Sequence, residues 1–273
     1  IILDNKSFQE IGKISGDAEY NENGELKNFT PANFLLGFGK INGRSVVIGG
    51  EDFTLKGGSP NPSGLRKSIY TEELALKYEI PLVRLHEGGG GSVAGSGGTA
   101  KKPTVPSGDA VFSKNRFQAL AQCLGKIPVA SAALGPVAGL PAARLVASHF
   151  SVMTKNSQVL IAGPAVVKRA LGIDISKEEL GGPEIHLKSG VVDNLAEDEE
   201  DALDQIKSFL SYLPNNYLEL PPDIKTKDKR NRIENDLLYI IPKDRRKTYD
   251  MRKVLSLILD QSSFFEYGRP IWF

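Results

Sequence analysis

The sequence has very little cysteine and histidine. Only one cysteine, Cys123, stands among the 273 residues, so no disulfide can form within the chain and cysteines cannot build a zinc site. The three histidines, His86, His149 and His186, lack the close spacing of a metal-binding pair. We therefore expect no metal in this chain, and a single cysteine fits a reducing compartment.

An excess of one charge and a long apolar run are also missing. The chain has 34 basic and 33 acidic residues, whereas a nucleic-acid-binding protein usually has a basic excess. No apolar run reaches the roughly 18 residues that a membrane-spanning helix needs. The chain starts at Ile1 without a signal or transit pattern. We therefore expect that the protein binds neither nucleic acid nor a membrane. We also expect that the chain is a processed or truncated piece of a longer protein.

Glycine and proline, in contrast, are abundant, with 28 and 16 residues. Short apolar runs that end at glycine or proline predict buried strands. Helical patterns lie between them, and a last helix with an apolar stripe follows the acidic residues 197–201, which favour a helix start. This alternation predicts an α/β fold. The predicted strands are 45–48, 80–85, 127–134 and 158–161, and the predicted helices are 64–78, 114–124, 141–150 and 165–171.

A nine-residue pattern, Ile-Leu-Asp-x-x-Ser-Phe-x-Glu, occurs at residues 2–10 and again at 258–266. Six identities at matched offsets indicate a duplicated unit, although two similar segments could also arise by coincidence. Prolines at 221–222 and the charged run 225–232 are typical of a linker. The repeat predicts a first domain at 1–220, a linker at 221–235 and the beginning of a second domain at 236–273.

Two glycine-rich segments follow predicted strands. The first, LHEGGGGS, covers residues 85–92, and its glycines suit either a backbone that approaches a ligand or a plain surface loop. The second, GPVAGLPAA at 135–143, opens a predicted helix and suits either a ligand or tight packing of helix on strand. Backbone N–H groups at such junctions can stabilise a developing negative charge.

No nucleophile paired with a base accompanies these segments. Cys123 falls within a helical pattern of apolar residues that is typical of a core, and His149 and His186 suit structural hydrogen bonds. The residues alone therefore predict an α/β protein with two loops of backbone donors and without an evident acid or base.

Five motifs in series carry a resemblance to a known family. The chain resembles the β subunits of propionyl-CoA and methylcrotonyl-CoA carboxylases over nearly its whole length, through Ser189-Gly190-Val191 and on to Tyr249 and Glu266. The motifs are FTLKGGS (53–59), LHEGGG (85–90), GPVAG (135–139), IAGPAVVK (161–168) and ELGGPEIH (179–186). The resemblance implies a crotonase-like (ClpP/crotonase) fold of repeated β-β-α units, with two such domains in each subunit.

The resemblance also implies a biotin-dependent carboxyltransferase. Such a subunit moves a carboxyl group from carboxybiotin to an acyl-CoA, and the biotin nitrogen takes the substrate proton, so no side-chain base is needed. By position, the implied backbone oxyanion donors are Gly89, Gly90, Ala138 and Gly139. The implied substrate-binding residues are Gly57, Gly58, Gly88, Gly91 and Val137.

The implied partners are acyl-CoA, a biotin carboxylase or biotin carrier subunit that brings the biotin, and further copies of the chain in a dimer-based oligomer, a hexamer. The implied location is the mitochondrial matrix in a eukaryote and the cytoplasm otherwise. Ser92 replaces the family's usual arginine, and Leu140 replaces a glycine. The alternatives are a decarboxylase of the same class, another crotonase-like enzyme, for which Glu87 would have to be a positioned acid, and a non-catalytic scaffold paralogue.

Overall fold

The computed structural model describes residues 2–90, 116–223, 225–229, 231–261 and 263–268. Contacts within the chain divide it into two compact units. The first unit comprises the described part of residues 1–221 together with Gly268, and the second comprises residues 222–267. Gly91 and Ser92 lie outside the described residues.

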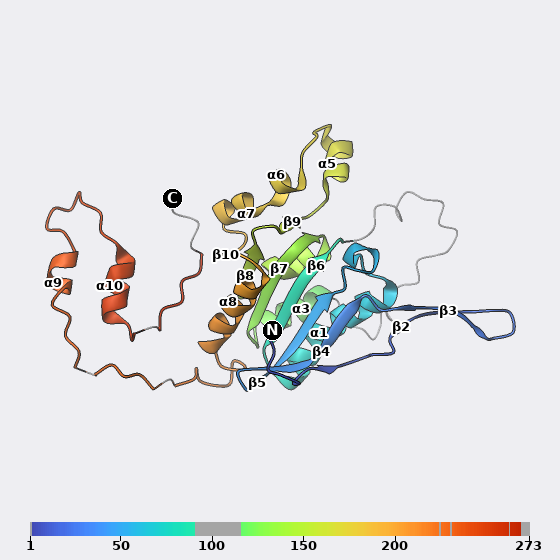
Figure 1. Ribbon diagram of the computed structural model, residues 1–273, viewed down its shortest axis with the longest axis horizontal. Coiled ribbons are helices and arrows are strands. Elements are labelled where there is room, and N and C mark those ends of the chain that lie inside the picture. Colours follow the sequence, from blue (N-terminus) through green and yellow to red (C-terminus); the bar gives the residue numbers. More distant parts are fainter. Residues whose placement is uncertain (1, 91–115, 224, 230, 262, 269–273) are drawn as a thin grey trace. The chain divides into compact units, whose positions relative to one another are not determined.

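The first unit is built around an eight-stranded sheet (Figure 1). Its strands follow the order β1-β4-β5-β6-β7-β8-β10, and β9 pairs with β7 beyond the end of β8. β1 and β4 are antiparallel to their neighbours, whereas the pairs from β5 to β10 are parallel. The strands are β1 (Gln9–Glu10), β4 (Phe34–Ile41), β5 (Arg44–Glu51), β6 (Leu82–Gly88), β7 (Val129–Ala138), β8 (Phe150–Thr154), β9 (Gln158–Leu160) and β10 (Asn194–Ala196).

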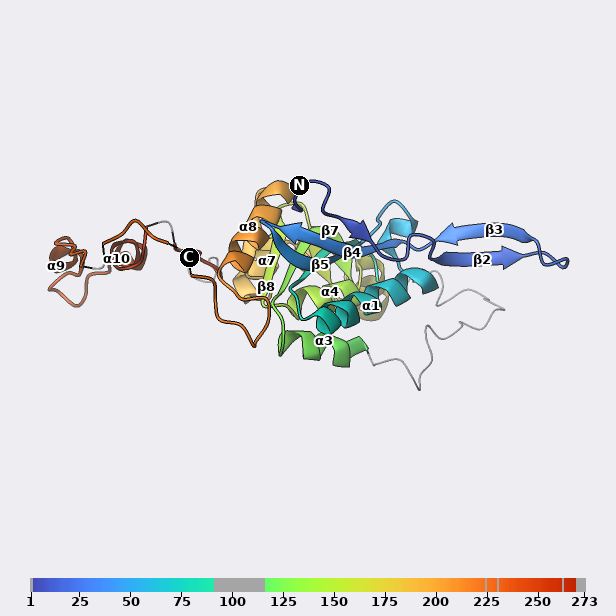
Figure 2. The same ribbon diagram turned by 90° about the horizontal axis from the view of Figure 1, so that it is seen from below.

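Helices cover both faces of this sheet (Figure 2). α1 (Pro62–Tyr78), α3 (Arg116–Leu124) and α4 (Leu140–Val146) lie on one face, and α8 (Glu199–Ser211) lies on the other. Leu74 of α1 and Cys123 of α3 pack against Val47 and Leu82 of the sheet. On the other face, the ring of Phe209 in α8 stacks on Phe150 at 4.9 Å between ring centroids. The strands are therefore buried on both sides, which suits their apolar composition.

Three short helices follow β9 and stand at the end of the sheet where the parallel strands terminate (Figure 1). They are α5 (Pro164–Leu171), α6 (Lys177–Gly181) and α7 (Pro183–Ser189). A 3-10 turn, η1 (Lys56–Gly58), follows β5. A hairpin of β2 (Gly16–Tyr20) and β3 (Leu26–Pro31) forms a separate two-stranded sheet.

The predicted α/β class and the four predicted strands are confirmed, with β5, β6, β7 and β9 at the predicted places. The acidic run before α8 is a helix start as predicted, since the carboxylate of Asp198 accepts a hydrogen bond from the N–H of Asp201 at 2.9 Å. The predicted helix 141–150 is wrong at its end. α4 stops at Val146, and Phe150 begins β8, because residues 150–154 are needed as a buried strand beside β7.

The described residues of the second unit include the helices α9 (Leu237–Ile240) and α10 (Met251–Ile258). Arg232 connects the start of this unit to the end of α10. Its guanidinium pairs with Asp228 and donates hydrogen bonds to the carbonyls of Leu257 and Leu259 at 2.6 and 2.8 Å. In the described residues of both units, no helix is long and apolar enough to cross a membrane.

Candidate functional site

Two glycine loops meet at one end of the sheet. The first follows β6 and the second follows β7, and these strands are adjacent and parallel, so their carboxyl ends lie at the same edge. A Cβ atom placed on Gly90 would lie 2.9 Å from the carbonyl oxygen of Ala138 and 3.0 Å from the Cα of Gly139. The loops thus touch through their backbones, an approach that a residue with a side chain would prevent.

The η1 turn joins the same cluster. The N–H of Gly89 donates to the carbonyl of Gly57 at 3.0 Å. Gly58 has a φ of +68°, and a Cβ there would lie 2.5 Å from the Cα of Gly88. The Ser59 hydroxyl donates to the carbonyl of Gly90 at 2.9 Å. Residues 57–59, 88–90 and 138–139 therefore form one compact group, which we call the glycine cluster.

The hydrogen bonds narrow the set of possible oxyanion donors. The N–H of Gly89 is bound to Gly57, and the N–H of Gly139 donates to the carbonyl of Leu160 at 3.0 Å. Both groups are committed within the fold, which argues against the donor role predicted for Gly89 and Gly139. Ala138 is the last residue of β7 and pairs with Leu160 of β9. Within the described residues, the backbone of Gly90 is bound through its carbonyl alone, and strand pairing does not by itself engage the N–H of Ala138, so Gly90 and Ala138 remain the candidate donors.

Val137, which the resemblance implied to bind substrate, lines neither of the two cavities described below. Its side chain is fully buried in a core cluster with Leu145 and Met153. The reason is the alternation of side chains along a strand. The side chain of Val137 points to one face of the sheet, into the core, and only its backbone lies near the strand ends where the loops meet. Gly57, Gly58 and Gly88 lie in the glycine cluster, whereas the predicted Gly91 is outside the described residues.

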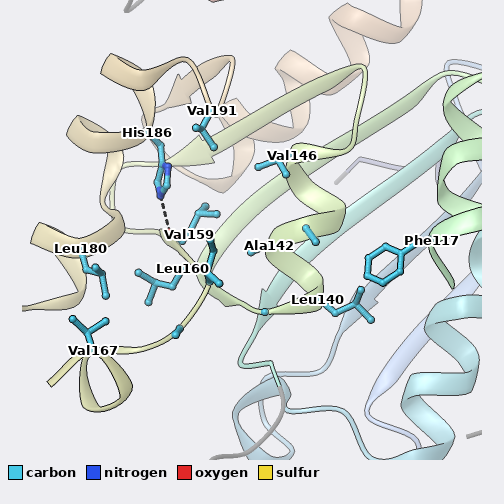
Figure 3. A pocket seen from close by; sticks show the side chains of 14 residues that line it. Phe117, Leu140, Ala142, Val146, Val159, Leu160, Val167, Leu180, His186 and Val191 are labelled. Carbon is cyan, nitrogen blue, oxygen red and sulfur yellow. Dashed lines mark hydrogen bonds between the residues drawn. The ribbon is translucent and has the colours of Figure 1, made fainter. Parts of the chain in front are cut away.

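A large apolar pocket begins at the second loop (Figure 3). Its volume is about 840 Å³, and α4, β9, α5, α6 and α7 form its walls. Among the described residues its lining has no carboxylate, lysine or arginine, and the only side chain with a strongly polar group is that of His186. The lining residues are Phe117, Gly139, Leu140, Ala142, Ala143, Val146, Val159, Leu160, Ile161, Ala162, Val167, Leu180, His186 and Val191.

His186 has a structural hydrogen bond, as predicted. Its Nε2 lies 2.6 Å from the carbonyl oxygen of Val159 (Figure 3). A carbonyl can only accept, so Nε2 carries the proton of this bond. The contact fastens α7 to β9 and thereby holds one wall of the apolar pocket in place.

A smaller cavity of about 240 Å³ lies between α1 and α4; it shares Leu140 with the apolar pocket and is also lined by Gly90. Buried charges line it, because Glu51 and Arg144 both face it. Nδ1 of His86 lies 3.1 Å from a carboxylate oxygen of Glu51. Burial alone would raise the pKa of Glu51, but the neighbouring His86, and more weakly Arg144, lower it, so Glu51 stays ionised.

A buried network of charged side chains connects α4 to α1 and β6. The carboxylate of Glu72 in α1 accepts hydrogen bonds from Arg144 of α4 at 2.8 Å and from Arg84 of β6 at 3.0 Å. Arg84 also donates to the carbonyl of Arg144 at 3.2 Å, and Arg144 donates to the hydroxyl of Ser68 at 3.0 Å. α1, β6 and α4 are therefore fixed to one another, and with them the two loops.

Glu87 points away from both pockets. It follows His86 on β6, so its side chain lies on the opposite face of the sheet, where its Oε1 would be 2.6 Å from a Cβ on Gly135. Burial, with a smaller contribution from Glu199, raises the pKa of Glu87. Its position favours a structural role and not that of an acid acting in the apolar pocket.

Sequence reasoning did not find the walls of the apolar pocket or the Glu72 network. Part of the pocket wall comes from the three short helices α5, α6 and α7. Their only signal in the sequence is apolar residues on helices that are too short to have a clear period. No group of histidine, cysteine, aspartate or glutamate that could hold a metal occurs in the described part of the chain.

The sheet, the helices on both faces and the glycine cluster at the strand ends are those of a crotonase-like carboxyltransferase domain. Residues 1–270 match the carboxyl transferase domain family, and this chain belongs to that family. Transcarboxylase 12S, a hexamer solved with methylmalonyl-coenzyme A and methylmalonic acid bound, has the same fold with a TM-score of 0.82 at 29% identity. That match covers 98% of this chain and 50% of the transcarboxylase chain.

Curated relatives include both carboxylase and decarboxylase subunits. The α subunit of methylmalonyl-CoA decarboxylase from Veillonella parvula is 31% identical over 97% of this chain and 50% of its own length. The carboxyltransferase subunit of propionyl-CoA carboxylase from Haloferax mediterranei is 30% identical over 96% of this chain and 49% of its own length. The chain thus spans about half the length of these relatives.

Proposed function

We propose that this chain is the acyl-CoA-binding half of a carboxyltransferase subunit that moves a carboxyl group between biotin and an acyl-CoA. One observation carries the proposal. The apolar pocket at the second glycine loop has no carboxylate among its described lining residues, and the Glu51 carboxylate in the smaller cavity that Gly90 lines is paired with His86. A hydratase or isomerase of this fold class would need a positioned acid or base there, whereas carboxyl transfer with biotin as proton acceptor does not.

The chain's own contribution is to bind the thioester and to stabilise its enolate. The N–H of Gly90 faces no competing acceptor among the described residues and is placed beside Ala138. A backbone donor aimed at a developing oxyanion is worth roughly 3 kcal/mol. Biotin, carried by a partner subunit, would supply the carboxyl group and accept the proton, and we assign no residue of this chain to it.

A second domain of the same type belongs to the proposal. In the first copy of the repeat the N–H of Ser7 donates to the carbonyl of Asp4 at 3.1 Å, and in the second copy the N–H of Ser263 donates to the carbonyl of Asp260 at 3.1 Å. The same turn therefore occurs at both places, which supports a duplication. We propose an acyl-CoA domain at 1–220, a linker at 221–235 and the start of a second carboxyltransferase domain at 236–273, in an oligomer built from dimers.

The direction of the reaction and the acyl group belong to the proposal as well. Propionyl-CoA and 3-methylcrotonyl-CoA are the proposed acceptors, and decarboxylation is the second candidate because one relative is a methylmalonyl-CoA decarboxylase subunit. The glycine cluster would serve both directions, since the same enolate forms in each.

The test is an assay of the full-length subunit with a biotin carrier and a panel of acyl-CoAs, run in both directions with labelled carboxyl groups. We expect carboxyl transfer that requires both biotin and thioester. Hydration or isomerisation of an enoyl-CoA without biotin would contradict the proposal, and so would the absence of any exchange with every thioester tested.

A further inference from the structure

The apolar pocket is much larger than a short acyl group needs. An apolar cavity of about 150 Å³ is enough to take up benzene, a ring of six carbons. The pocket measured here has about 840 Å³, near the upper end of the roughly 300–1,000 Å³ of small-molecule sites. A three-carbon acyl group would leave most of it unfilled.

The pocket also lies where an acyl chain would extend. It begins at Gly139 and Leu140 in the second loop, and Gly139 touches Gly90 of the first loop. A thioester held at the glycine cluster therefore has this pocket beside its acyl carbon atoms. Farther from the loops, α5 and α6 contribute Val167 and Leu180, and α4 contributes Ala142 and Val146 (Figure 3).

The lining offers almost nothing to a polar ligand. His186 is its one strongly polar side chain among the described residues, and the Nε2 of His186 is bound to Val159. A ligand that fills the pocket gains chiefly from burial of apolar surface, which is non-directional and grows with the number of buried carbons.

We infer that this pocket binds an extended apolar acyl chain, so that the subunit accepts CoA thioesters of medium or greater chain length besides the short ones proposed above and binds them more tightly than propionyl-CoA. The inference rests on the proposed function for its thioester, and it sharpens the choice of substrate. Alternative occupants are a second copy of this chain or a segment of the full-length subunit, and the measurements below separate them.

The first measurement is the dissociation constant of saturated acyl-CoAs from two to ten carbons with the full-length subunit. We expect affinity to rise about fourfold for each added methylene, the ratio that corresponds to about 0.8 kcal/mol, until the pocket is full. A flat series, or affinity that falls beyond four carbons, would overturn the inference.

The second measurement compares two tryptophan variants. Val146 lines the pocket and is 46% exposed, whereas Leu35 on β4 is 51% exposed and lines none of the pockets described above. Val146→Trp should reduce the ratio of octanoyl-CoA to propionyl-CoA affinity at least tenfold, and Leu35→Trp should leave that ratio within twofold. An equal ratio in both variants would contradict the inference, as would an altered oligomeric state of Val146→Trp with an unchanged ratio.

Binding and transfer are scored separately, so the two proposals can fail separately. A rise of affinity with chain length in a subunit that transfers no carboxyl group would remove the proposed function and retain the acyl pocket. Efficient carboxylation of propionyl-CoA, with weaker binding of longer thioesters, would retain the function and remove the pocket.

Discussion

Glu72 is the carboxylate that neutralises two buried arginines. Its carboxylate accepts from both Arg84 and Arg144, and all three side chains are almost fully buried. Burial lowers the pKa of Arg84, and Glu72 opposes that effect. Ions are costly to remove from water, so such a network is stabilising only while each charge keeps its partner.

Replacing the Glu72 carboxylate should therefore strongly reduce the stability of the fold. Glu72→Gln leaves two buried guanidinium groups without a counter-charge, and we expect the free energy of unfolding to fall by about 3–5 kcal/mol. Denaturant unfolding followed by circular dichroism measures the change. The neighbouring Glu73 is outside the network, and Glu73→Gln should stay within about 0.5 kcal/mol of the parent chain. Equal stability of the two variants would show that the network does not hold α4.

Loops and strands differ in how well the sequence predicts them. β5, β6, β7 and β9 were predictable because each is a short apolar run with glycine or proline at its end. β8 was not, because a helix pattern runs from α4 directly into it and the strand is defined by pairing with β7. Pairing between distant segments is not encoded in local composition, and β10 was missed for the same reason, since it pairs with β8. β4 was missed although it forms a hairpin with the adjacent β5 across Asn42-Gly43, a turn that the sequence does signal.

The candidate site was predictable in part for similar reasons. The glycine loops were visible as runs of glycine after strands, and the structure brings Gly90 and Gly139 together. The sequence could not show which N–H groups are already bound, and Gly89 and Gly139 proved to donate to Gly57 and Leu160. Hydrogen-bond partners depend on the final packing, so the sequence could not distinguish bound N–H groups from free ones, and the donor roles stay a prediction.

At the level of the loops, Gly90 offers a direct test. A Cβ there would press on Ala138 and Gly139 at 2.9–3.0 Å, so Gly90→Val should push the two loops apart. We expect the rate of carboxyl transfer to fall by at least a hundredfold, because the oxyanion donor moves, with a cost in stability of about 1–3 kcal/mol. Steady-state kinetics and thermal unfolding measure both.

The matched control is Gly125→Val, since a Cβ on Gly125 would meet only ordinary contacts at 3.8 Å or more. It should keep its transfer rate within a few-fold. Unchanged turnover in Gly90→Val, with an intact fold, would show that the first loop is a structural element without a part in the chemistry.

At the level of the whole molecule, the proposed function places the site of only one of the two reactants, the acyl-CoA, in this chain. The glycine cluster and the apolar pocket lie in the first unit, within residues 57–191, and nothing in the proposal assigns biotin to this chain. A reaction between two bound partners gains most from holding both in line, a contribution of roughly 7–11 kcal/mol. The chain also spans only about half the length of its relatives.

The 273-residue chain by itself should therefore bind acyl-CoA weakly and transfer no carboxyl group, whereas the full-length subunit should be oligomeric and active. The physical reason is that the effective concentration of the second reactant is lost when its pocket is absent, so the chemical step returns to a slow encounter from solution. Light scattering coupled to size-exclusion chromatography measures the assembly, and a carboxyl-transfer assay with a biotin carrier compares the two chains at equal molarity. The isolated chain should still show its circular dichroism and cooperative unfolding, which separates a missing pocket from a failure to fold. An active 273-residue chain, or a monomeric full-length subunit with full activity, would refute the two-domain mechanism, because one unit would then suffice to hold both reactants.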